Sequence, residues 1–472
     1  MTASVIHWFR RDLRLHDNLA LQAASESGAP VIPLFIFDPD LLHGKNSSPA
    51  RTKFLLKALE SLDATLRRQG SALLIRHGDP HEILPQIAAE TAASALYFNR
   101  DYTPYALHRD VAVTQNLSIP VHTYDDAVLL APGEVLKPDG KPFVVFTPFK
   151  KRWLTIPKMS VVDVPKPDSF VKLGEYSSLA FEPIPSLADL GFALTIDVPD
   201  ASESEAARRL EAFISGRGKD YATRRNDLAF EPGDDTIPGT SFLSPYLRFG
   251  MLSPRQAYWA AREAYQTGRN DSERESLETW VSELVWREFY VHILYHFPHV
   301  LKRNFRDNYE HVEWRHAPDE LQAWKDGQTG YPIVDAAMRQ LQAMGWMPNR
   351  ARMIVASFLC KDLLIHWQEG ERHFMRWLID GDLAANNGGW QWTAGTGTDA
   401  QPYFRIFNPV SQSQKFDSDG IYIRRWIPEL RDVPTKLIHA PWEMSTPPAD
   451  YPTPIVEHDF ARARTLAAFK KT

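Results

Sequence analysis

The stretch Val31-Ile-Pro-Leu-Phe-Ile-Phe37 decides the fold of the first part of the chain. It is a short apolar run rich in aliphatic and aromatic residues, which is typical of a fully buried strand. Similar runs lie before and after it, at Val5–Phe9, Leu73–Arg76, Ala95–Asn99 and Val121–Tyr124. Helical patterns separate several of these runs, at Arg51–Arg68, Pro80–Thr91 and Tyr105–Gln115. Strands that alternate with helices predict a parallel, doubly wound sheet, so residues 1–130 are expected to form an α/β domain.

The remaining sequence is organised differently. Residues 131–200 contain 10 of the 35 prolines, and proline interrupts both helices and strand ladders, so we expect a long interdomain connector with little regular structure. From residue 201 onward the patterns are helical. Ser202 and Glu205 have the spacing of a capping box, and Gly216 is expected to end the helix that they begin. We therefore predict an all-helical domain over residues 201–472, with helices near 254–267, 276–297, 332–344, 349–364 and 370–379.

Composition narrows the class of protein. A single cysteine among 472 residues excludes an intramolecular disulfide and a Cys-rich zinc site. The N-terminus lacks the apolar core of a signal peptide, and no apolar run approaches the length of a membrane span. We therefore expect a cytoplasmic monomer with no membrane partner. The net charge of −6 argues only weakly against DNA binding, because attraction to phosphate depends on a local basic patch.

The motifs of ordinary hydrolytic, nucleotide or metal chemistry do not occur. There is no Gly-x-Gly-x-x-Gly turn, Walker loop, His-Glu-x-x-His or Gly-x-Ser-x-Gly, so a nucleotide role for the α/β domain rests on fold analogy alone. Asp380-Gly-Asp382 has the start of a calcium loop, but Ala385 and Gln391 stand where that loop needs glycine and glutamate. We predict no metal site and infer that a cofactor carries the chemistry.

Four features admit both a functional and a structural interpretation. Gly239–Pro245 places three hydroxyls before a predicted helix, which suits a pyrophosphate but also plain N-capping. The face formed by Glu283, Trp286, Arg287 and Tyr290 suits a nucleic acid base, or a charge pair beside core aromatics. Between Arg339 and Trp377, six basic residues oppose three acidic ones, which indicates a phosphate-binding patch or a solvated helix face. Twelve of the 14 tryptophans lie from Trp259 onward, which suits a large core, base stacking or a redox relay.

Taken together, these segments resemble the photolyase/cryptochrome family over essentially the whole chain, most closely class I cyclobutane-dimer photolyases. The most specific segments are Trp8–Asn18, Glu283–Tyr290, Thr329–Asp335, Asp380–Trp392 and Phe404–Pro409. The resemblance implies reduced FAD as cofactor and UV-damaged DNA as partner. Excited FADH⁻ would donate an electron to a cyclobutane pyrimidine dimer that has been flipped out of the duplex; photolyases are a named example of base flipping.

The resemblance also implies a role for individual residues. The FAD-binding residues would be Tyr221, Thr240, Ser241, Phe242, Leu243, Ser244, Trp280, Glu283, Asn349, Arg352, Asp380, Gly381, Asp382 and Asn386. The residues that hold DNA or the dimer would be Arg225, Glu283, Trp286, Arg287, Asn349, Arg350, Met353, Trp392 and Gln412. Catalytic roles would fall to Glu283 as a hydrogen-bond donor to the dimer, Asn386 opposite flavin N5, and Trp390, Trp367 and Trp314 as the electron relay that photoreduces the flavin.

Alternative functions remain within and outside this family. Repair of (6-4) photoproducts uses two histidines in related enzymes, and Asn349 and Met353 stand at those positions. Cryptochromes, which are blue-light photoreceptors, often replace the amide at the position of Asn386 and add a tail. A non-photochemical FAD oxidoreductase is the alternative from another class.

The family often carries an antenna pigment, here expected to be 5,10-methenyltetrahydrofolate or 8-hydroxy-5-deazaflavin. Lys150 fits a folate pocket, but Ala106 and Lys45 stand where folate-type relatives have a glutamate and a histidine.

Overall fold

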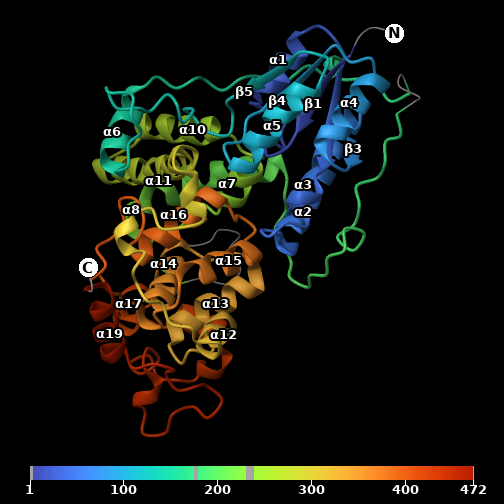
Figure 1. Cartoon of the computed structure of the whole chain (residues 1–472). Helices are drawn as coiled ribbons and strands as arrows, with labels where there is room; N and C mark the ends of the chain where they lie inside the picture. Colours follow the sequence, from blue (N-terminus) through green and yellow to red (C-terminus); the bar gives the residue numbers. More distant parts are fainter. Residues whose placement is uncertain (1–3, 175–178, 230–238, 471–472) are drawn as a thin grey trace.

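The computed structural model describes residues 4–174, 179–229 and 239–470. Figure 1 shows an α/β part, in blue and cyan, above a larger helical part in green to red. The α/β part contains one sheet of five parallel strands in the order β3-β2-β1-β4-β5. The strands are β1 (Val5–Phe9), β2 (Val31–Phe37), β3 (Leu74–His77), β4 (Ala95–Asn99) and β5 (Val121–Tyr124). Four of them have the predicted bounds, and β3 begins and ends one residue later.

The two faces of the sheet are covered by different helices, because successive strand side chains point to opposite sides. Ile6 and Trp8 pack in one buried cluster with residues of α4 (Pro80–Glu90) and α5 (Pro104–Asn116). Val5 and Phe9 belong to another cluster, shared with α1 (Leu19–Glu26), α3 (Pro49–Arg68) and the helical part. The doubly wound sheet is therefore confirmed, and one of its faces shares a core with the helices below it.

Every regular element that the structure describes in residues 201–470 is a helix, and none of these helices is both long and apolar enough to cross a bilayer. The helices nearest the sheet are α7 (Glu203–Ser215), α8 (Tyr221–Arg224), α9 (Ser244–Phe249), α10 (Pro254–Thr267) and α11 (Asp271–His296). The others are α12 (Pro318–Asp326), α13 (Pro332–Met344), α14 (Asn349–Ser357), α15 (Trp367–Trp377), α16 (Leu383–Ala394), α17 (Pro409–Phe416), α18 (Ile421–Trp426) and α19 (His458–Lys470). A π-helical turn at Phe358–Asp362 extends α14.

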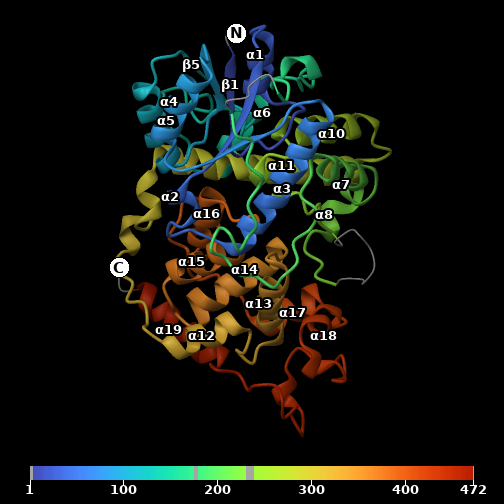
Figure 2. The same cartoon turned by 90° about the vertical axis from the view of Figure 1, so that its right-hand side faces the viewer.

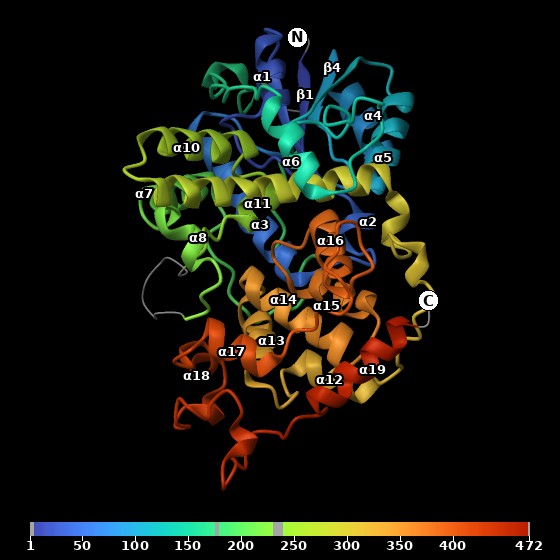
Figure 3. The ribbon, with the colours of Figure 1, turned by 90° about the vertical axis from the view of Figure 1, so that its left-hand side faces the viewer.

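The connector contains more structure than its proline content predicts. Helix α6 (Phe146–Thr155) lies along α11, as Figure 3 shows. The later residues follow α3: the Nζ of Lys53 donates to the carbonyl of Ile196 at 2.6 Å, and that of Lys57 to Val198 at 2.7 Å. Figure 2 shows α3 between the two parts of the molecule. The connector thus covers both parts of the molecule.

Helix α7 begins at the predicted cap but without a capping box. The Oγ of Ser202 accepts from the backbone N–H of Glu205, whereas the carboxylate of Glu205 pairs with Arg208 and Arg209. A complete capping box occurs instead at the start of α10, between Ser253 and Gln256. The capping-box prediction was therefore only half right, because nearby guanidinium groups bind the carboxylate.

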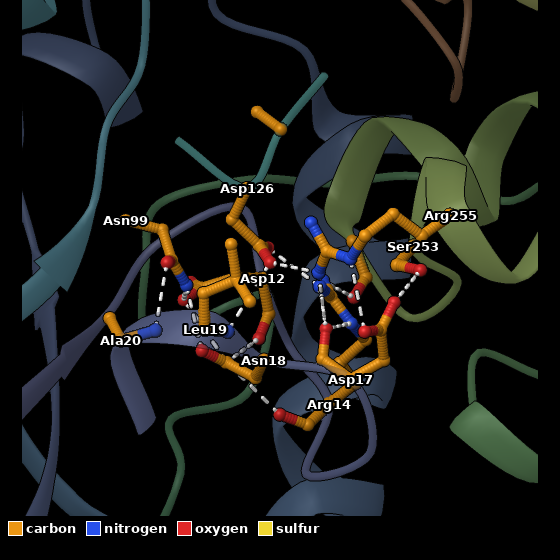
Figure 4. Close-up of polar contacts among 12 residues, drawn as sticks. Asp12, Arg14, Asp17, Asn18, Leu19, Ala20, Asn99, Asp126, Ser253 and Arg255 are labelled. Atoms are coloured by element: carbon orange, nitrogen blue, oxygen red, sulfur yellow. Dashed lines mark hydrogen bonds and ion pairs between the residues drawn. The ribbon is translucent and has the colours of Figure 1, made fainter. Parts of the chain in front are cut away.

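A buried polar network joins the two parts at the carboxyl ends of the strands (Figure 4). Asp126 accepts from Arg14 and from Arg255, each at 2.6 Å, and Arg255 also reaches Asp17 at 3.0 Å. Asp17 in turn accepts from the hydroxyl of Ser253. Doubly wound sheets usually bind ligands at this edge. Here side chains of the protein itself form a dense network there and connect the parts.

Candidate functional site

A cavity of about 180 Å³ lies among α14, α15 and α16. Its lining consists of Asn349, Arg352, Met353, Ala356, Phe374, Leu378, Asp380, Gly381, Asp382, Ala385, Asn386, Gly389, Trp390 and Thr393. Many of these are predicted site residues, and they come from segments that are far apart in the sequence. The fold thus brings together the predicted cofactor residues of α14 and of the segment 380–390.

Asp380 is held from two sides. Its Oδ2 accepts from Nη2 of Arg352 at 2.8 Å and from the hydroxyl of Ser244 at 2.6 Å. Its Oδ1 is buried and has no hydrogen-bond partner among the described residues. Buried polar groups are normally paired, so a free carboxylate oxygen on a cavity wall indicates a place for a ligand with a donor group.

The segment before α9 offers a second unpaired group. The Oγ1 of Thr240 is buried without a partner in the described part of the chain. The neighbouring hydroxyls are bound by indoles: Nε1 of Trp280 donates to Ser241 at 3.4 Å, and Nε1 of Trp346 to Ser244 at 3.2 Å. Phe242 has φ of 52°, a strained conformation that clusters at ligand sites. These groups fit a cofactor that carries hydroxyls and phosphates, such as FAD.

Asp382 is the N-cap of α16. Its Oδ1 accepts from the N–H groups of Ala384 and Ala385, and its Oδ2 from Nη2 of Arg11 at 2.6 Å. Burial alone would raise the pKa of Asp382, but Arg11, Arg248 and other positive groups hold it well below its usual range. The carboxylate is therefore ionised.

Helix α16 approaches its neighbours closely at two points. A Cβ at Gly388 would lie 2.0 Å from Cδ1 of Tyr290, and a Cβ at Gly370 of α15 would lie 2.0 Å from Cη2 of Trp390. Only glycine fits such contacts. Gly388 and Gly389 lie inside α16, which continues to Ala394 and packs against α11.

Asn386 lies on the cavity wall, and its Nδ2 donates to the backbone carbonyl of Glu371 at 3.0 Å. Asn387 donates to the carboxylate of the same residue at 2.8 Å. Burial raises the pKa of Glu371 to about 7, although this hydrogen bond acts in the opposite direction. α15 therefore fixes the amide that the sequence predicts opposite the flavin.

The three predicted relay tryptophans extend from the cavity toward the surface. Trp390 lines the cavity and packs on Gly370, one helical turn from Trp367. The ring of His366 lies 5.5 Å from that of Trp367 and 5.2 Å from that of Trp314, between ring centroids. Trp367 is fully buried, whereas Trp314 is half-buried.

Glu283 and Arg225 form an ion pair of 2.6 Å between α11 and the end of α8. Burial raises the pKa of Glu283, and Arg225 and Lys150 oppose this effect. Arg225 also lies over the ring of Tyr221, at 5.4 Å. Burial and the neighbouring positive charges thus act in opposite directions on this carboxyl, and burial has the larger effect.

Trp286 stacks on Phe146, with centroids 3.6 Å apart and planes 5° apart. Arg287 makes its contacts elsewhere, and its DNA contact stays a prediction. The Nη1 of Arg287 donates to the carbonyl of Ala127 at 2.8 Å, and the side chain lines a small pocket with Arg11 and Asp101. The guanidinium therefore supports the junction between the two parts.

The other predicted DNA contacts surround the outer end of the site. Arg350 donates to Oδ1 of Asn226, and its pKa is lowered by burial and by the positive charges of Arg225 and Arg405. These three arginines form a positive rim. Asn349 is exposed and Met353 and Trp392 are half-buried, while Oε1 of Gln412 is buried and unpaired within the described residues.

The six basic residues between Arg339 and Trp377, for which the sequence left a phosphate-binding patch and a solvated helix face open, do not form one surface. Lys361 is fully buried and donates to the carbonyl of Ala394 at 2.6 Å. Arg339 pairs with Glu429, and Arg372 with Glu369. The helices direct these charged side chains to different places. The net charge of a stretch of sequence therefore does not show that its residues form one charged surface.

Four residues of the site were missed by sequence reasoning: Phe146, Arg11, Trp346 and Phe374. Phe374 packs on Trp390 with centroids 4.9 Å apart. Each contacts a predicted residue from a distant segment, and no spacing rule indicates such contacts. Only Arg11 had a local signal, since it lies in the segment Trp8–Asn18 that carries part of the family resemblance.

Comparisons with known proteins agree with this geometry. The family model described as DNA photolyase matches residues 5–168, and that described as the FAD binding domain of DNA photolyase matches residues 280–471. The deoxyribodipyrimidine photo-lyase of Escherichia coli is 44% identical over 100% of this chain and 99% of its own length.

Solved structures are similar over the same extent. A bacterial class III photolyase from Agrobacterium tumefaciens has a TM-score of 0.89 and 37% identity, covering 100% of this chain and 98% of its own. An archaeal photolyase from Sulfolobus tokodaii with two FAD molecules has a TM-score of 0.82 and 32% identity, covering 99% of this chain and 100% of its own. A cryptochrome from Synechocystis has a TM-score of 0.86 and 30% identity, covering 99% of each chain.

Proposed function

This chain belongs to the DNA photolyase family, and from that premise we propose that it is a deoxyribodipyrimidine photo-lyase, which splits cyclobutane pyrimidine dimers in UV-damaged DNA under light. The observation that carries the proposal is the cavity at which Asp380, Asn386 and Trp390 meet. These residues would hold reduced FAD, which would supply the electron that light moves onto the dimer and that returns once the ring has split. No nucleophile or metal is required, which agrees with the sequence motifs.

The chain's own residues bind and orient the cofactor. The unpaired Oδ1 of Asp380 is able to accept a hydrogen bond from the cofactor, and the hydroxyl of Thr240 is able to donate or to accept one. The hydroxyls of Ser241 and Ser244 belong to the same segment as Thr240. The positive charge of Arg352, 2.8 Å from Asp380, favours a negatively charged cofactor in the cavity. Asn386 is held by Glu371, so its amide is fixed before the cofactor arrives.

The DNA meets the surface formed by the positive rim and α11. Arg225, Arg350 and Arg405 attract phosphates, and Trp286 offers a ring for stacking on a flipped base. Glu283, whose pKa is raised by burial, donates a hydrogen bond to the dimer's carbonyl oxygen as negative charge develops there. We further propose that the protein acts as a monomer in the cytoplasm.

For the antenna we propose 8-hydroxy-5-deazaflavin rather than the folate. Ala106 is buried and supplies no carboxylate, Lys45 lies near Glu371, and Lys150 donates to Ser282 at 2.6 Å. The residues expected at a folate pocket thus contact different elements. A second flavin-like pigment also has a precedent in the archaeal structure that contains two FAD molecules. Extraction of the pigments from purified protein, followed by absorption spectra, tests FAD and antenna together.

The repair activity is tested on UV-irradiated DNA that contains both cyclobutane dimers and (6-4) photoproducts. We expect the reduced protein to remove only the cyclobutane dimers, and only in blue or near-UV light, because Asn349 and Met353 cannot act as the acid–base pair of (6-4) repair. Removal in the dark would favour a non-photochemical enzyme. Light absorption and flavin reduction without loss of dimers would favour a cryptochrome.

A further inference from the structure

The first residue of α6, Phe146, lies between Trp286 and the protein core. Its ring is parallel to the indole at 3.6 Å, and its edge-on neighbour on the core side is Phe289, which is fully buried. Phe146 is 8% exposed, whereas Trp286 is half-buried. One face of the indole is therefore covered by the phenyl ring. Phe289 lies edge-on to the indole at 5.7 Å and Tyr290 is tilted to it at 5.6 Å, between ring centroids, and the indole still keeps exposed surface.

Two contacts from the segment between α16 and α17 fix the start of α6. Oδ2 of Asp399 accepts from the N–H of Phe146 at 3.0 Å, and the hydroxyl of Thr398 donates to the carbonyl of Val144 at 2.5 Å. Asp399 has φ of 44°, a strained conformation for a residue other than glycine. Such strain persists only where surrounding contacts over-determine the backbone, so the position of Phe146 is set from outside its own helix.

Further contacts hold α6 on α11. Nε1 of Trp153 donates to the buried carboxylate of Glu288 at 2.6 Å, and Nζ of Lys150 donates to Ser282 at 2.6 Å. Phe146, Lys150 and Trp153 follow each other at helical spacing, so one face of α6 makes all three contacts. The connector thereby presents one rigid aromatic ring to the indole.

On the basis of the proposed repair function, we propose that Phe146 is a positioning residue for lesion recognition: it holds the indole of Trp286 flat, so that its free face stacks on the flipped dimer. Stacking on an aromatic side chain contributes to binding of an extruded base. A ring that is already immobilised loses less rotational freedom when the base arrives, so more of the stacking energy appears as affinity. Phe146 itself does not touch the dimer.

The test measures binding in the dark, with FAD-loaded protein and a duplex that carries one cyclobutane thymine dimer. Phe146→Leu keeps apolar bulk but removes the flat partner, and we expect about tenfold weaker binding of this duplex, with unchanged binding of undamaged DNA. Phe146→Tyr, which keeps the ring, should bind like the wild type. Phe149→Leu, three residues later on the same helix and packed on Phe289, is the matched control for lost packing and should change lesion affinity little.

A double-mutant cycle shows whether Phe146 acts through the indole. In a Trp286→Leu background, Phe146→Leu should have no further effect on lesion affinity. Two results overturn the proposal. One is that Phe146→Leu lowers lesion affinity equally in the wild-type and the Trp286→Leu backgrounds. The other is that Phe146→Leu alone binds the lesion as tightly as the wild type does. If the wild type itself does not distinguish the dimer from undamaged DNA, the proposed repair function fails and this inference fails with it. If Phe146→Leu discriminates between the two as strongly as the wild type does, the inference alone is overturned.

Discussion

Arg11, just after β1, donates to the carboxylate of Asp382 at 2.6 Å and so connects the α/β part to the first turn of α16. The same guanidinium reaches Asp101, beyond β4, at 3.2 Å. Helix α16 carries Asn386 and Trp390, which line the cavity. The α/β part therefore supports the cofactor site directly.

Substitution of Arg11 tests this support. Arg11→Met leaves the largely buried carboxylate of Asp382 with one partner fewer, which should cost about 2 kcal/mol of unfolding free energy and reduce FAD retention. Thermal unfolding and the ratio of flavin to protein measure both effects. Arg100→Gln removes an exposed ion pair with Asp125 in the same part and should change neither. If Arg11→Met unfolds and retains flavin like this control, the support is absent.

The raised pKa of Glu371 predicts a specific pH dependence of the free energy of unfolding. Its pKa is raised to about 7, so between pH 4.5 and 7 the folded state binds more protons than the unfolded state, and the free energy of unfolding falls as pH rises. Glu371→Gln should equal the wild type near pH 5 and exceed it by about 3 kcal/mol near pH 8. Denaturant unfolding at both pH values measures the difference, and a gap that is the same at the two values would show that the carboxyl is not protonated in the fold.

Trp314→Phe should block photoreduction of oxidised flavin but spare repair by enzyme that has been reduced chemically. The reason is that Trp314 is the outermost member of the relay and does not line the cavity, whereas Trp390 does. Trp259→Phe is the control, since Trp259 donates to Met159 of the connector, away from the relay. Loss of both activities in Trp314→Phe would show a structural role instead.

Substitution of Glu283 should lower the repair yield more than it lowers the FAD content. Glu283→Ala removes the hydrogen-bond donor to the dimer, and we expect the repair yield per absorbed photon to fall about tenfold or more, while most of the FAD is retained. Glu283→Gln keeps a donor at this position and should lose less. Repair yield and flavin content are measured on the same preparations; a flavin-free Glu283→Ala protein would assign the residue to the cofactor instead.

How much the sequence predicts depends on the range of the interactions. Periodicity is local, so β1, β2, β4, β5, α10 and α13 have the predicted bounds. Helix α6 was missed because its segment contains prolines and because its contacts are with α11, more than 120 residues later.

The site shows the same division. The resemblance supplied Asp380, Asn386 and Trp390, which the structure brings to one cavity. It also supplied Arg287, but the hydrogen bond of its guanidinium to the distant carbonyl of Ala127 follows from no local pattern. Phe146 carries no motif at all, and its importance follows only from the parallel ring beside it.

The most direct measurement of the central claim follows the absorbance of dimer-containing oligothymidylate near 260 nm while blue light is switched on and off. Splitting of each dimer restores two thymines and their ultraviolet absorption. With reduced, FAD-loaded protein, we expect absorbance to rise during every light period and to stay flat in every dark period. A rise that continues in the dark, or no rise in the light, would contradict the central claim.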